Sequence, residues 1–206
     1  FTPRPPVESE SPRPMILTVG RVVPKKGFHT LIQACRLLKD RGVQFQCLFI
    51  SGAGVGEQEI VSLIEKLDLT DVITMRPAVT QEQLQKIYHQ ATLFALPCQI
   101  ASNGDRDGIP NVLVEAMATG LPVISTKVSG IPELVDQGVN GLLVPEKNAE
   151  ALAVSKQLIS DKKVHFKKAQ ILLKQIDTKT VSEIAYEVGF NSPSYFIKRF
   201  RELFGV

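Results

Sequence analysis

The stretch Asp107-Gly-Ile-Pro-Asn-Val-Leu-Val-Glu115-Ala-Met-Ala-Thr-Gly120 predicts a short helix with marked ends. Pro110 suits the first helical position, where its missing N–H costs no hydrogen bond, and Gly120 suits the left-handed residue that closes a helix. Between them, Glu115 is the only charge among Val, Leu, Ala and Met side chains. An unpaired carboxylate in apolar surroundings costs on the order of several kcal/mol. We therefore expect Glu115 to hold a partner.

A second carboxylate, Asp107, precedes Glu115 by eight positions and lies in the glycine-rich loop Asn103-Gly-Asp-Arg-Asp-Gly108. Two carboxylates at the mouth of a helix can accept hydrogen bonds from hydroxyls, while the backbone N–H groups there can bind phosphate. A ligand with hydroxyls at both ends and phosphates in the middle is a nucleotide sugar. The residues leave another interpretation open, in which Asp107 caps the helix and Glu115 forms an internal salt bridge.

Short apolar runs alternate with helical patterns on both sides of this stretch. The runs have the length and composition of buried strands. They are Met15 to Val19, Phe45 to Ile50, Val72 to Met75, Leu93 to Leu96, Leu121 to Thr126 and Gly141 to Val144. Helical patterns lie near 28–41, 58–67, 81–90 and 110–120. The alternation predicts an α/β fold, a Rossmann-like doubly wound parallel sheet with right-handed crossovers.

The first predicted strand runs into a basic loop, Gly20-Arg-Val-Val-Pro-Lys-Lys-Gly-Phe28. In open α/β sheets, ligands bind outside the carboxyl ends of the strands, which is where this loop is expected. Arg21 and Lys26 are well placed there to neutralise a diphosphate, Arg21 through a two-pronged contact and Lys26 as a point charge. Basic residues in loops are also commonly just solvated, so the pair alone does not define a site.

A glycine cluster, Ser51-Gly-Ala-Gly-Val-Gly56, follows the second predicted strand. Glycines such as Gly52 and Gly54 permit close approach of the backbone to a phosphate or a nucleotide. The spacing differs from the dinucleotide pattern Gly-x-Gly-x-x-Gly, so the cluster by itself does not identify a ligand.

In these motifs the chain resembles the retaining glycosyltransferases of family 4, also called group 1. The acidic stretch resembles the family's two carboxylates separated by seven residues, with Asp107 where the family usually has Glu. The basic loop resembles the family's first donor-site signature, Gly-Arg followed by Lys-Gly. The resemblance covers residues 15–152 or so and corresponds to the C-terminal, donor-binding half of a two-domain GT-B enzyme.

The resemblance implies transfer of a hexose from a nucleotide-diphosphate sugar, a UDP- or GDP-sugar, with retention of configuration and with no metal or other cofactor. It implies catalytic roles for Arg21, Lys26 and Asp107, the two bases stabilising the departing diphosphate. The residues implied to bind the donor are Gly20, Gly52, Gly54, Ile109, Pro110, Asn111, Val112 and Glu115. The implied process is synthesis of a cell-surface polysaccharide or glycoconjugate. The acceptor-binding half is not part of this resemblance, so we expect the chain alone to bind donor and turn over little.

The composition, with 44% hydrophobic and 22% charged residues, is that of a soluble globular protein. Its apolar runs fall well short of the roughly 18 to 20 residues of a membrane-spanning helix. Cys35, Cys47 and Cys98 lack Cys-x-x-Cys spacing, so we expect buried free thiols in a reducing compartment, the cytoplasm. Residues 1–14, with five prolines, predict a linker.

From Ala151 onward the chain changes character, with ten Lys or Arg against five Asp or Glu. Residues 180–205 predict a short helix, a turn and a second helix, in which Thr180 and Glu183 can form a capping box and Ser192 can cap the second helix. Residues 164–206 or so resemble the second helix-turn-helix of AraC-type transcription regulators. That module has two such units, whereas this chain has one and stops before the final helix.

The second resemblance implies that five residues face the major groove of DNA: Asn191, Ser192, Ser194, Tyr195 and Lys198. A single unit offers few phosphate contacts, so its DNA binding would be weak and strongly salt-dependent. In the alternative interpretation, the aromatic residues of the tail serve packing.

Two functions from different classes therefore stand at this point. One is a nucleotide-sugar-binding glycosyltransferase domain, residues 15–155, and the other is a DNA-binding regulator that acts through a helical tail, residues 156–206. Neither part explains the other, which predicts a chimera of two incomplete modules.

Overall fold

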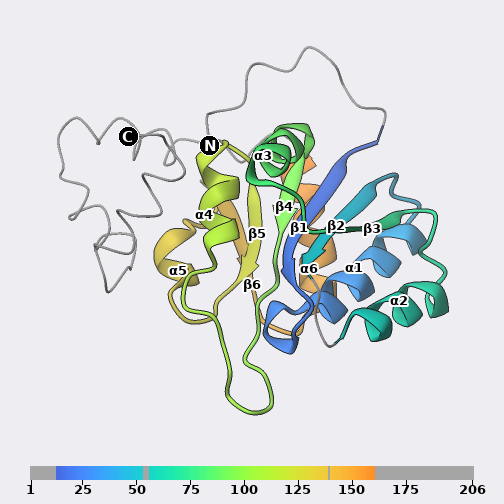
Figure 1. The fold of residues 1–206 in the computed structure, drawn as a ribbon, viewed down its shortest axis with the longest axis horizontal. Coiled ribbons are helices and arrows are strands. Elements are labelled where there is room, and N and C mark those ends of the chain that lie inside the picture. The colour runs from blue at the N-terminus through green and yellow to red at the C-terminus, as the bar shows by residue number, and fades with distance from the viewer. Residues whose placement is uncertain (1–12, 53–55, 139, 161–206) are drawn as a thin grey trace.

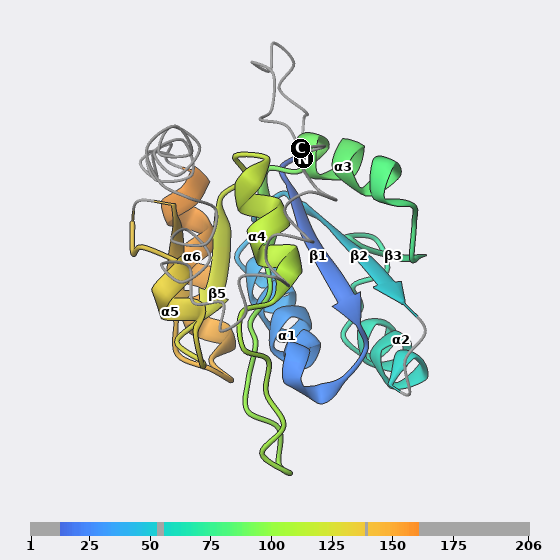
Figure 2. The same ribbon diagram turned by 60° about the vertical axis from the view of Figure 1, so that its left-hand side comes forward.

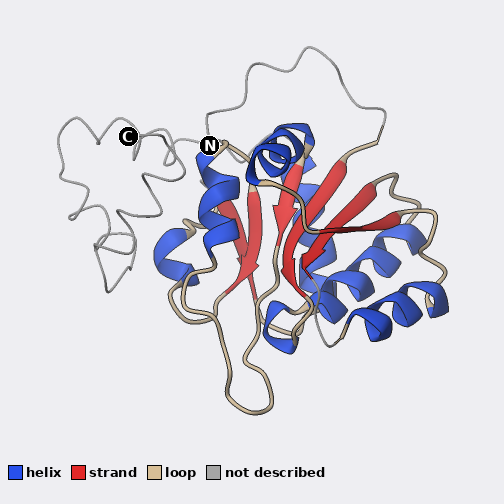
Figure 3. Ribbon diagram, in the orientation of Figure 1, coloured by secondary structure: helices blue, strands red, loops and turns tan. Residues whose placement is uncertain are grey.

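The computed structural model describes residues 13–52, 56–138 and 140–160. Strands and helices alternate along this part of the chain (Figure 3). The strands are β1 (Met15–Arg21), β2 (Gln46–Gly52), β3 (Ile73–Pro77), β4 (Leu93–Ala95), β5 (Val123–Thr126) and β6 (Gly141–Val144). The helices are α1 (Phe28–Asp40), α2 (Glu57–Lys66), α3 (Gln81–Gln90), α4 (Asn111–Ala118), α5 (Ile131–Leu134) and α6 (Ala149–Ser160), with a 3-10 turn, η1 (Pro24–Lys26), ahead of α1.

All the strands pair in parallel in one sheet, in the order β3-β2-β1-β4-β5-β6 (Figure 1). The chain winds outward from β1 to β3, returns to place β4 beside β1, and then winds outward in the other direction. The prediction of a Rossmann-like doubly wound parallel sheet is confirmed. The winding direction reverses between β1 and β4, and the crevice at the carboxyl ends of two such strands is where ligands of open sheets bind.

Helices cover both faces of the sheet. Leu93 and Ala95 of β4 line an apolar space together with Leu31 of α1 and Leu152 of α6. Phe94, between them in the strand, contacts the ring of Tyr88 on α3 with 5.8 Å between ring centroids. Because side chains alternate along a strand, α1 and α6 lie on one face and α3 on the other. Figure 2 shows α4 on the α3 side and α2 beside α1.

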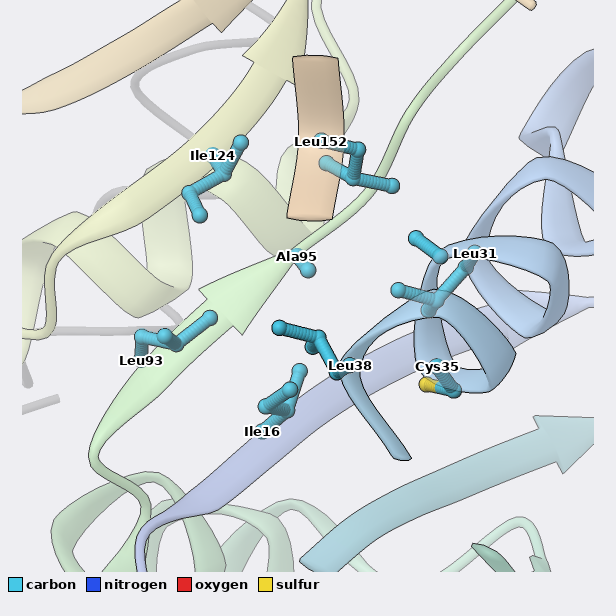
Figure 4. Close-up of a pocket in the computed structure, with 9 residues that line it drawn as sticks. Ile16, Leu31, Cys35, Leu38, Leu93, Ala95, Ile124 and Leu152 are labelled. Atoms are coloured by element: carbon cyan, nitrogen blue, oxygen red, sulfur yellow. The ribbon is translucent and has the colours of Figure 1, made fainter. Parts of the chain in front are cut away.

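The apolar space between the sheet, α1 and α6 is part of the hydrophobic core (Figure 4). Its free volume is about 10 Å³, which holds at most a single water. Its lining residues are Ile16, Leu31, Ala34, Cys35, Leu38, Leu93, Ala95, Ile124 and Leu152. A cavity of this size and apolar lining has no room for a nucleotide, so this space is part of the packed core.

The central helix differs from its prediction by one position at its start. Pro110 takes the N-cap position with extended backbone, and α4 begins at Asn111. The predicted end is confirmed, since Gly120 is left-handed with φ 77° and its N–H bonds the carbonyl of Met117. The N–H of Leu121 then bonds the carbonyl of Ala116, which completes a Schellman closure.

Other boundaries move for local reasons. The fifth strand begins at Val123 and not at Leu121, because the N–H of Leu121 serves the helix closure and Pro122 has no N–H. The last helix, α6, includes residue 155, and the domain boundary expected there stays a prediction. The thiols of Cys35, Cys47 and Cys98 are buried and free, as expected. Most of the expected linker and the helix-turn-helix tail lie outside the described residues.

None of the helices in the described part of the chain combines the length and the apolar composition that crossing a bilayer requires.

Candidate functional site

The loops that follow β1 and β4 meet at the carboxyl edge of the sheet. Gly27 has φ 67°, and a Cβ there would overlap the carbonyl oxygen of Pro97, so only glycine lets the two loops come this close. Gln99 joins them further, since its backbone N–H donates to the carbonyl of Lys25 at 3.0 Å. Its side-chain Nε2 donates to the carbonyl of Pro24 at 2.8 Å. The two loops therefore form one unit at the switch point of the sheet.

Charged side chains link the same two loops. Lys26 Nζ lies 2.7 Å from Oδ2 of Asp107, and Lys25 Nζ lies 3.4 Å from Oδ1 of the same carboxylate. Lys25 Nζ also donates to Oδ1 of Asp105 at 3.1 Å. The side chains of Lys26 and Asp107 are only 13% and 18% exposed. Asp107 therefore does not cap α4 but pairs with two lysines of the β1 loop.

The contact of Lys26 with Asp107 differs in geometry from the contact of Lys25 with Asp105. Oδ2 of Asp107 is buried and makes no hydrogen bond within the described part of the chain, so its contact with Lys26 is an ion pair without hydrogen-bond alignment. Lys25, in contrast, donates a hydrogen bond to Asp105. This bond, together with the negative charge of Asp107, raises the pKa of Lys25 above its ordinary value although partial burial opposes the rise. Lys25 therefore stays charged at neutral pH.

Glycines leave space around the basic side chains. A Cβ at Gly20 would lie 3.5 Å from Cε of Lys26, so the lysine side chain passes over this glycine. Arg21 is the exposed last residue of β1 and pairs in register with Gly52, the last residue of β2. Of the predicted glycines, Gly54 lies outside the described residues.

Glu115 lies just over one turn into α4 and is half-buried. The hydroxyl of Tyr88, on α3, lies 3.3 Å from Oε2 of Glu115 and 3.3 Å from the carbonyl oxygen of Val112. The ring of Tyr88 is fully buried. Burial first, and then the charge of Glu115, raise the pKa of Tyr88 well above its ordinary value. The expected partner of Glu115 therefore includes a buried phenol on the neighbouring helix.

The remaining predicted residues lie where the β4 loop enters α4. Pro110 is buried, and Asn111 and Val112 are half-buried in the first turn of the helix. Ile109 packs against the start of α5, where a Cβ on Gly130 would lie 2.9 Å from its Cγ1. Backbone and apolar contacts thus fix the entry into α4 between the two carboxylates.

A buried thiol lies near the ion pairs. Burial raises the pKa of Cys98 to about 12, although the charge of Lys26 opposes the rise. The thiol therefore stays protonated at neutral pH and is not a nucleophile there.

The structure adds residues that the sequence analysis did not select. They are Lys25, Tyr88, Gln99, Asp105 and Glu146, whose Oε2 accepts from the N–H of Ile100 at 2.8 Å. The sequence could have indicated Lys25 and Asp105, because they lie close to the selected residues Lys26 and Asp107, in a basic loop and an acidic loop. Tyr88 carried none, since nothing local distinguishes a core tyrosine from one that reaches a carboxylate.

Residues 3–174 match the family model of the glycosyl transferases group 1. The chain belongs to the group 1 glycosyltransferases. Residues 172–206 match a second family model, bacterial regulatory helix-turn-helix proteins of the AraC family. Both predicted resemblances are thus confirmed as family matches, in the predicted order along the chain.

Two curated relatives and one solved structure show the extent of the likeness. The chain is 43% identical over 153 residues to the putative colanic acid biosynthesis glycosyltransferase WcaL of Escherichia coli K12, a match that covers 74% of this chain and 37% of the relative. It is 32% identical over 142 residues to the GDP-mannose-dependent alpha-(1-6)-phosphatidylinositol monomannoside mannosyltransferase of Mycobacterium tuberculosis, covering 68% of this chain and 37% of the relative. The chain thus spans little more than a third of these relatives' length.

The solved structure is the C-terminal domain of a group 1 family glycosyl transferase, LpcC, from Francisella tularensis. It matches with a TM-score of 0.63 at 24% identity, over 76% of this chain and 80% of that chain. At this identity the likeness concerns the fold, which is the Rossmann-like half of a GT-B protein.

Proposed function

We propose that this group 1 glycosyltransferase chain binds a nucleotide-diphosphate sugar at the carboxyl ends of β1 and β4, as the donor half of a retaining hexosyltransferase. The single observation that carries the proposal is the cluster of Lys25, Lys26 and Asp107 at the switch point of the sheet. Two ammonium groups and a carboxylate, largely shielded from water, match a ligand with both phosphates and hydroxyls, and Arg21 at the end of β1 adds an exposed positive charge.

Each side chain has a distinct role in the proposal. Arg21 and Lys26 neutralise the diphosphate and stabilise its charge as it departs. Asp107 accepts hydrogen bonds from hydroxyls of the hexose, and Glu115 accepts from a hydroxyl elsewhere on the donor. Gly20 and Gly52 keep space for the phosphates beside the two bases.

Five further residues complete the proposed donor contacts: Gly54, Ile109, Pro110, Asn111 and Val112. Those of α4 and its entry lie between the two carboxylates in sequence, where the backbone N–H groups of a helix start favour an anion.

The relatives support the donor class and the process. One relative's name specifies GDP-mannose as its donor, and the other's name assigns it to colanic acid biosynthesis. We propose that this chain uses a UDP- or GDP-sugar for a cell-surface polysaccharide or glycoconjugate, in the cytoplasm. Because the chain spans about a third of these relatives, an acceptor-binding domain like theirs is proposed to be needed for turnover.

Calorimetric titration of the chain with UDP, GDP and their sugar conjugates tests the proposal. Saturable binding is expected, and Lys26→Met should weaken it by about tenfold or more, since an ion pair to phosphate is lost. Lys86→Met is the matched control, because Lys86 lies on α3 with its side chain 68% exposed. A folded chain that binds none of these ligands, or that loses as much affinity in the control as in Lys26→Met, contradicts the proposed function.

DNA binding is a second candidate, favoured by the match of residues 172–206 to the AraC-type family model. The residues predicted to contact DNA, Asn191, Ser192, Ser194, Tyr195 and Lys198, lie outside the described residues. A mobility shift at low salt tests it. A discrete complex that disappears when Tyr195→Ala and Lys198→Ala are combined supports this function, and no complex at low salt contradicts it.

A further inference from the structure

The contact between Tyr88 and Glu115 joins a wholly buried side chain to one at the proposed donor site. We infer that Tyr88 is a positioning residue, whose hydroxyl holds the carboxylate of Glu115 in the orientation that accepts a donor hydroxyl. The inference rests on the proposed function, because it concerns how one donor contact is prepared. Tyr88 itself touches no ligand in it.

The ring of Tyr88 is held firmly in place. It is fully buried and packs against Phe94 of the central strand β4, with 5.8 Å between ring centroids. Its helix is fixed at the start by a capping box, in which Thr80 and Gln83 each bond the other's backbone N–H. The hydroxyl thus has a defined position relative to the sheet, and a side chain bonded to it inherits that position.

The hydroxyl reaches two acceptors of the first turns of α4. Oε2 of Glu115 and the carbonyl oxygen of Val112 both lie 3.3 Å away. A phenol has one proton to donate, and a charged carboxylate is the stronger acceptor of the two. The hydrogen bond therefore restricts rotation of the Glu115 carboxylate, and α4 fixes the backbone of the same residue.

The phenol also keeps its proton under physiological conditions. Burial and the neighbouring negative charge of Glu115 both raise the pKa of Tyr88 well above its ordinary value. The phenol therefore donates a hydrogen bond throughout the neutral pH range, and a hydrogen-bond donor stabilises the charged form of a carboxylate. This chemistry distinguishes Tyr88 from a phenylalanine that would fill the same volume.

Tyr88→Phe isolates the hydroxyl, because it keeps the ring and its packing. Donor affinity is measured by calorimetry on the full chain, for wild type, Tyr88→Phe, Glu115→Ala and the double variant, with UDP and GDP. We expect a loss of about three- to tenfold in Tyr88→Phe, the effect of one hydrogen bond acting through another group. In the double variant the loss should equal that of Glu115→Ala alone, because Tyr88 acts only through Glu115.

Thr119→Val is the matched control. Thr119 also lies buried at the end of α4, and its hydroxyl bonds the carbonyl of Ala116 at 2.7 Å without reaching Glu115. This variant should lower thermal stability as Tyr88→Phe does and leave donor affinity unchanged. Equal affinity losses in both variants, additive losses in the double variant, or an unchanged affinity in Tyr88→Phe would each overturn the positioning role.

A ligand-free measurement separates this inference from the proposed function. Absorbance titration follows ionisation of the chain's three tyrosines, and Tyr88 should ionise last because its pKa is raised. Glu115→Ala removes a neighbouring charge and should lower the pKa of Tyr88. If the wild type binds no nucleotide but this shift occurs, the proposed function fails and the contact stands. If the titration is unchanged, the inference fails whatever the chain binds.

Discussion

Asp107 and Glu115 form one pair in the sequence, but the molecule holds them by different means. Asp107 lies in the loop after β4 and pairs with Lys25 and Lys26, from the loop after β1. Glu115 lies on a helix and meets the hydroxyl of Tyr88, whose ring belongs to the core. The loop that carries Asp107 is mostly exposed, whereas α4 packs on the sheet.

Because their partners differ, only one of the two carboxylates is expected to exchange partners. Salt weakens ion pairs, less strongly where the charges are partly buried as here, and an arriving phosphate competes for the same lysines. A hydrogen bond from a buried phenol is not displaced by an anion. We therefore expect Asp107 to release Lys26 when a diphosphate binds, while Glu115 keeps its orientation throughout.

Gly27→Ala should disrupt the contact between the β1 and β4 loops that positions Asp107, and we expect it to have the largest effect. Its Cβ would overlap the carbonyl oxygen of Pro97, at a backbone φ of 67° that disfavours any side chain. We expect a loss of roughly 3 kcal/mol or more in the free energy of unfolding, measured with urea.

Gly42→Ala is the control for Gly27→Ala. Gly42 has a similar φ of 70°, but a Cβ there meets nothing within 4 Å. It should cost only the backbone strain, about 1 to 2 kcal/mol. Equal losses in the two variants would show that the contact between the β1 and β4 loops contributes nothing.

Asp107→Asn should raise the affinity of the chain for pyrophosphate. Removing this charge leaves Lys26 without its ion-pair partner, so its ammonium becomes available to phosphate. We expect calorimetry to show tighter binding by roughly tenfold, about 1.4 kcal/mol. Glu115→Gln should leave pyrophosphate affinity nearly unchanged, because the ion pairs of Lys25 and Lys26 are made with Asp105 and Asp107. Weaker binding in Asp107→Asn would contradict partner exchange.

The succession of strands and helices along the chain could be predicted from the sequence, because it depends on local patterns. The site roles of the two carboxylates stay predictions. Apolar runs, the proline before α4 and Gly120 after it each act within a few residues. The partners could not be predicted, since Tyr88 and Glu115 are 27 residues apart and Lys25 and Asp105 are 80 apart. Such contacts arise only when the crossovers bring β1 and β4 side by side and place α3 next to α4.

The errors in predicted strand boundaries also come from contacts that the local pattern does not show. The strand expected from Leu121 starts at Val123 because a backbone N–H is claimed by the helix closure. The prediction that Glu115 needs a partner was sound in its physics. The salt bridge and the ligand hydroxyl that the charge pattern suggested stay predictions. The phenol of Tyr88 is a partner that the pattern could not reveal, because it carries no charge.

Tyr88→Phe should change how stability depends on pH. Tyr88 has a raised pKa in the folded state, so its contribution is fully present below the ordinary tyrosine value of 10.0 and is lost as pH rises toward the folded value. Wild-type stability should thus fall above about pH 10, by up to about 1.4 kcal/mol per pH unit from this group. Lys25 and Lys39 also have raised pKa values and add to the fall.

The difference between wild type and Tyr88→Phe removes those lysine contributions. Unfolding in urea between pH 8 and 11 or so should show this difference constant at first and shrinking above about pH 10. A difference that does not change with pH would mean that the phenol ionises as freely in the folded chain as in the unfolded one.

The ion pair between Lys25 and Asp105 should contribute the smallest coupling energy. Its dependence on salt should differ most clearly from that of the contact between Tyr88 and Glu115. Asp105 is 52% exposed, and ion pairs of this kind contribute about 0.2 to 1 kcal/mol. Lys25 also contacts Asp107, so a double-mutant cycle of Lys25→Met and Asp105→Asn is needed to isolate the pair. Its coupling energy should fade at about 1 M salt, where the Debye length is about 3 Å. The same cycle for Tyr88→Phe and Glu115→Ala should keep its coupling in salt, because the phenol is buried and uncharged. If salt erased both couplings alike, Glu115 would be held no more firmly than Asp107, and the distinction between an exchangeable and a fixed carboxylate would not stand.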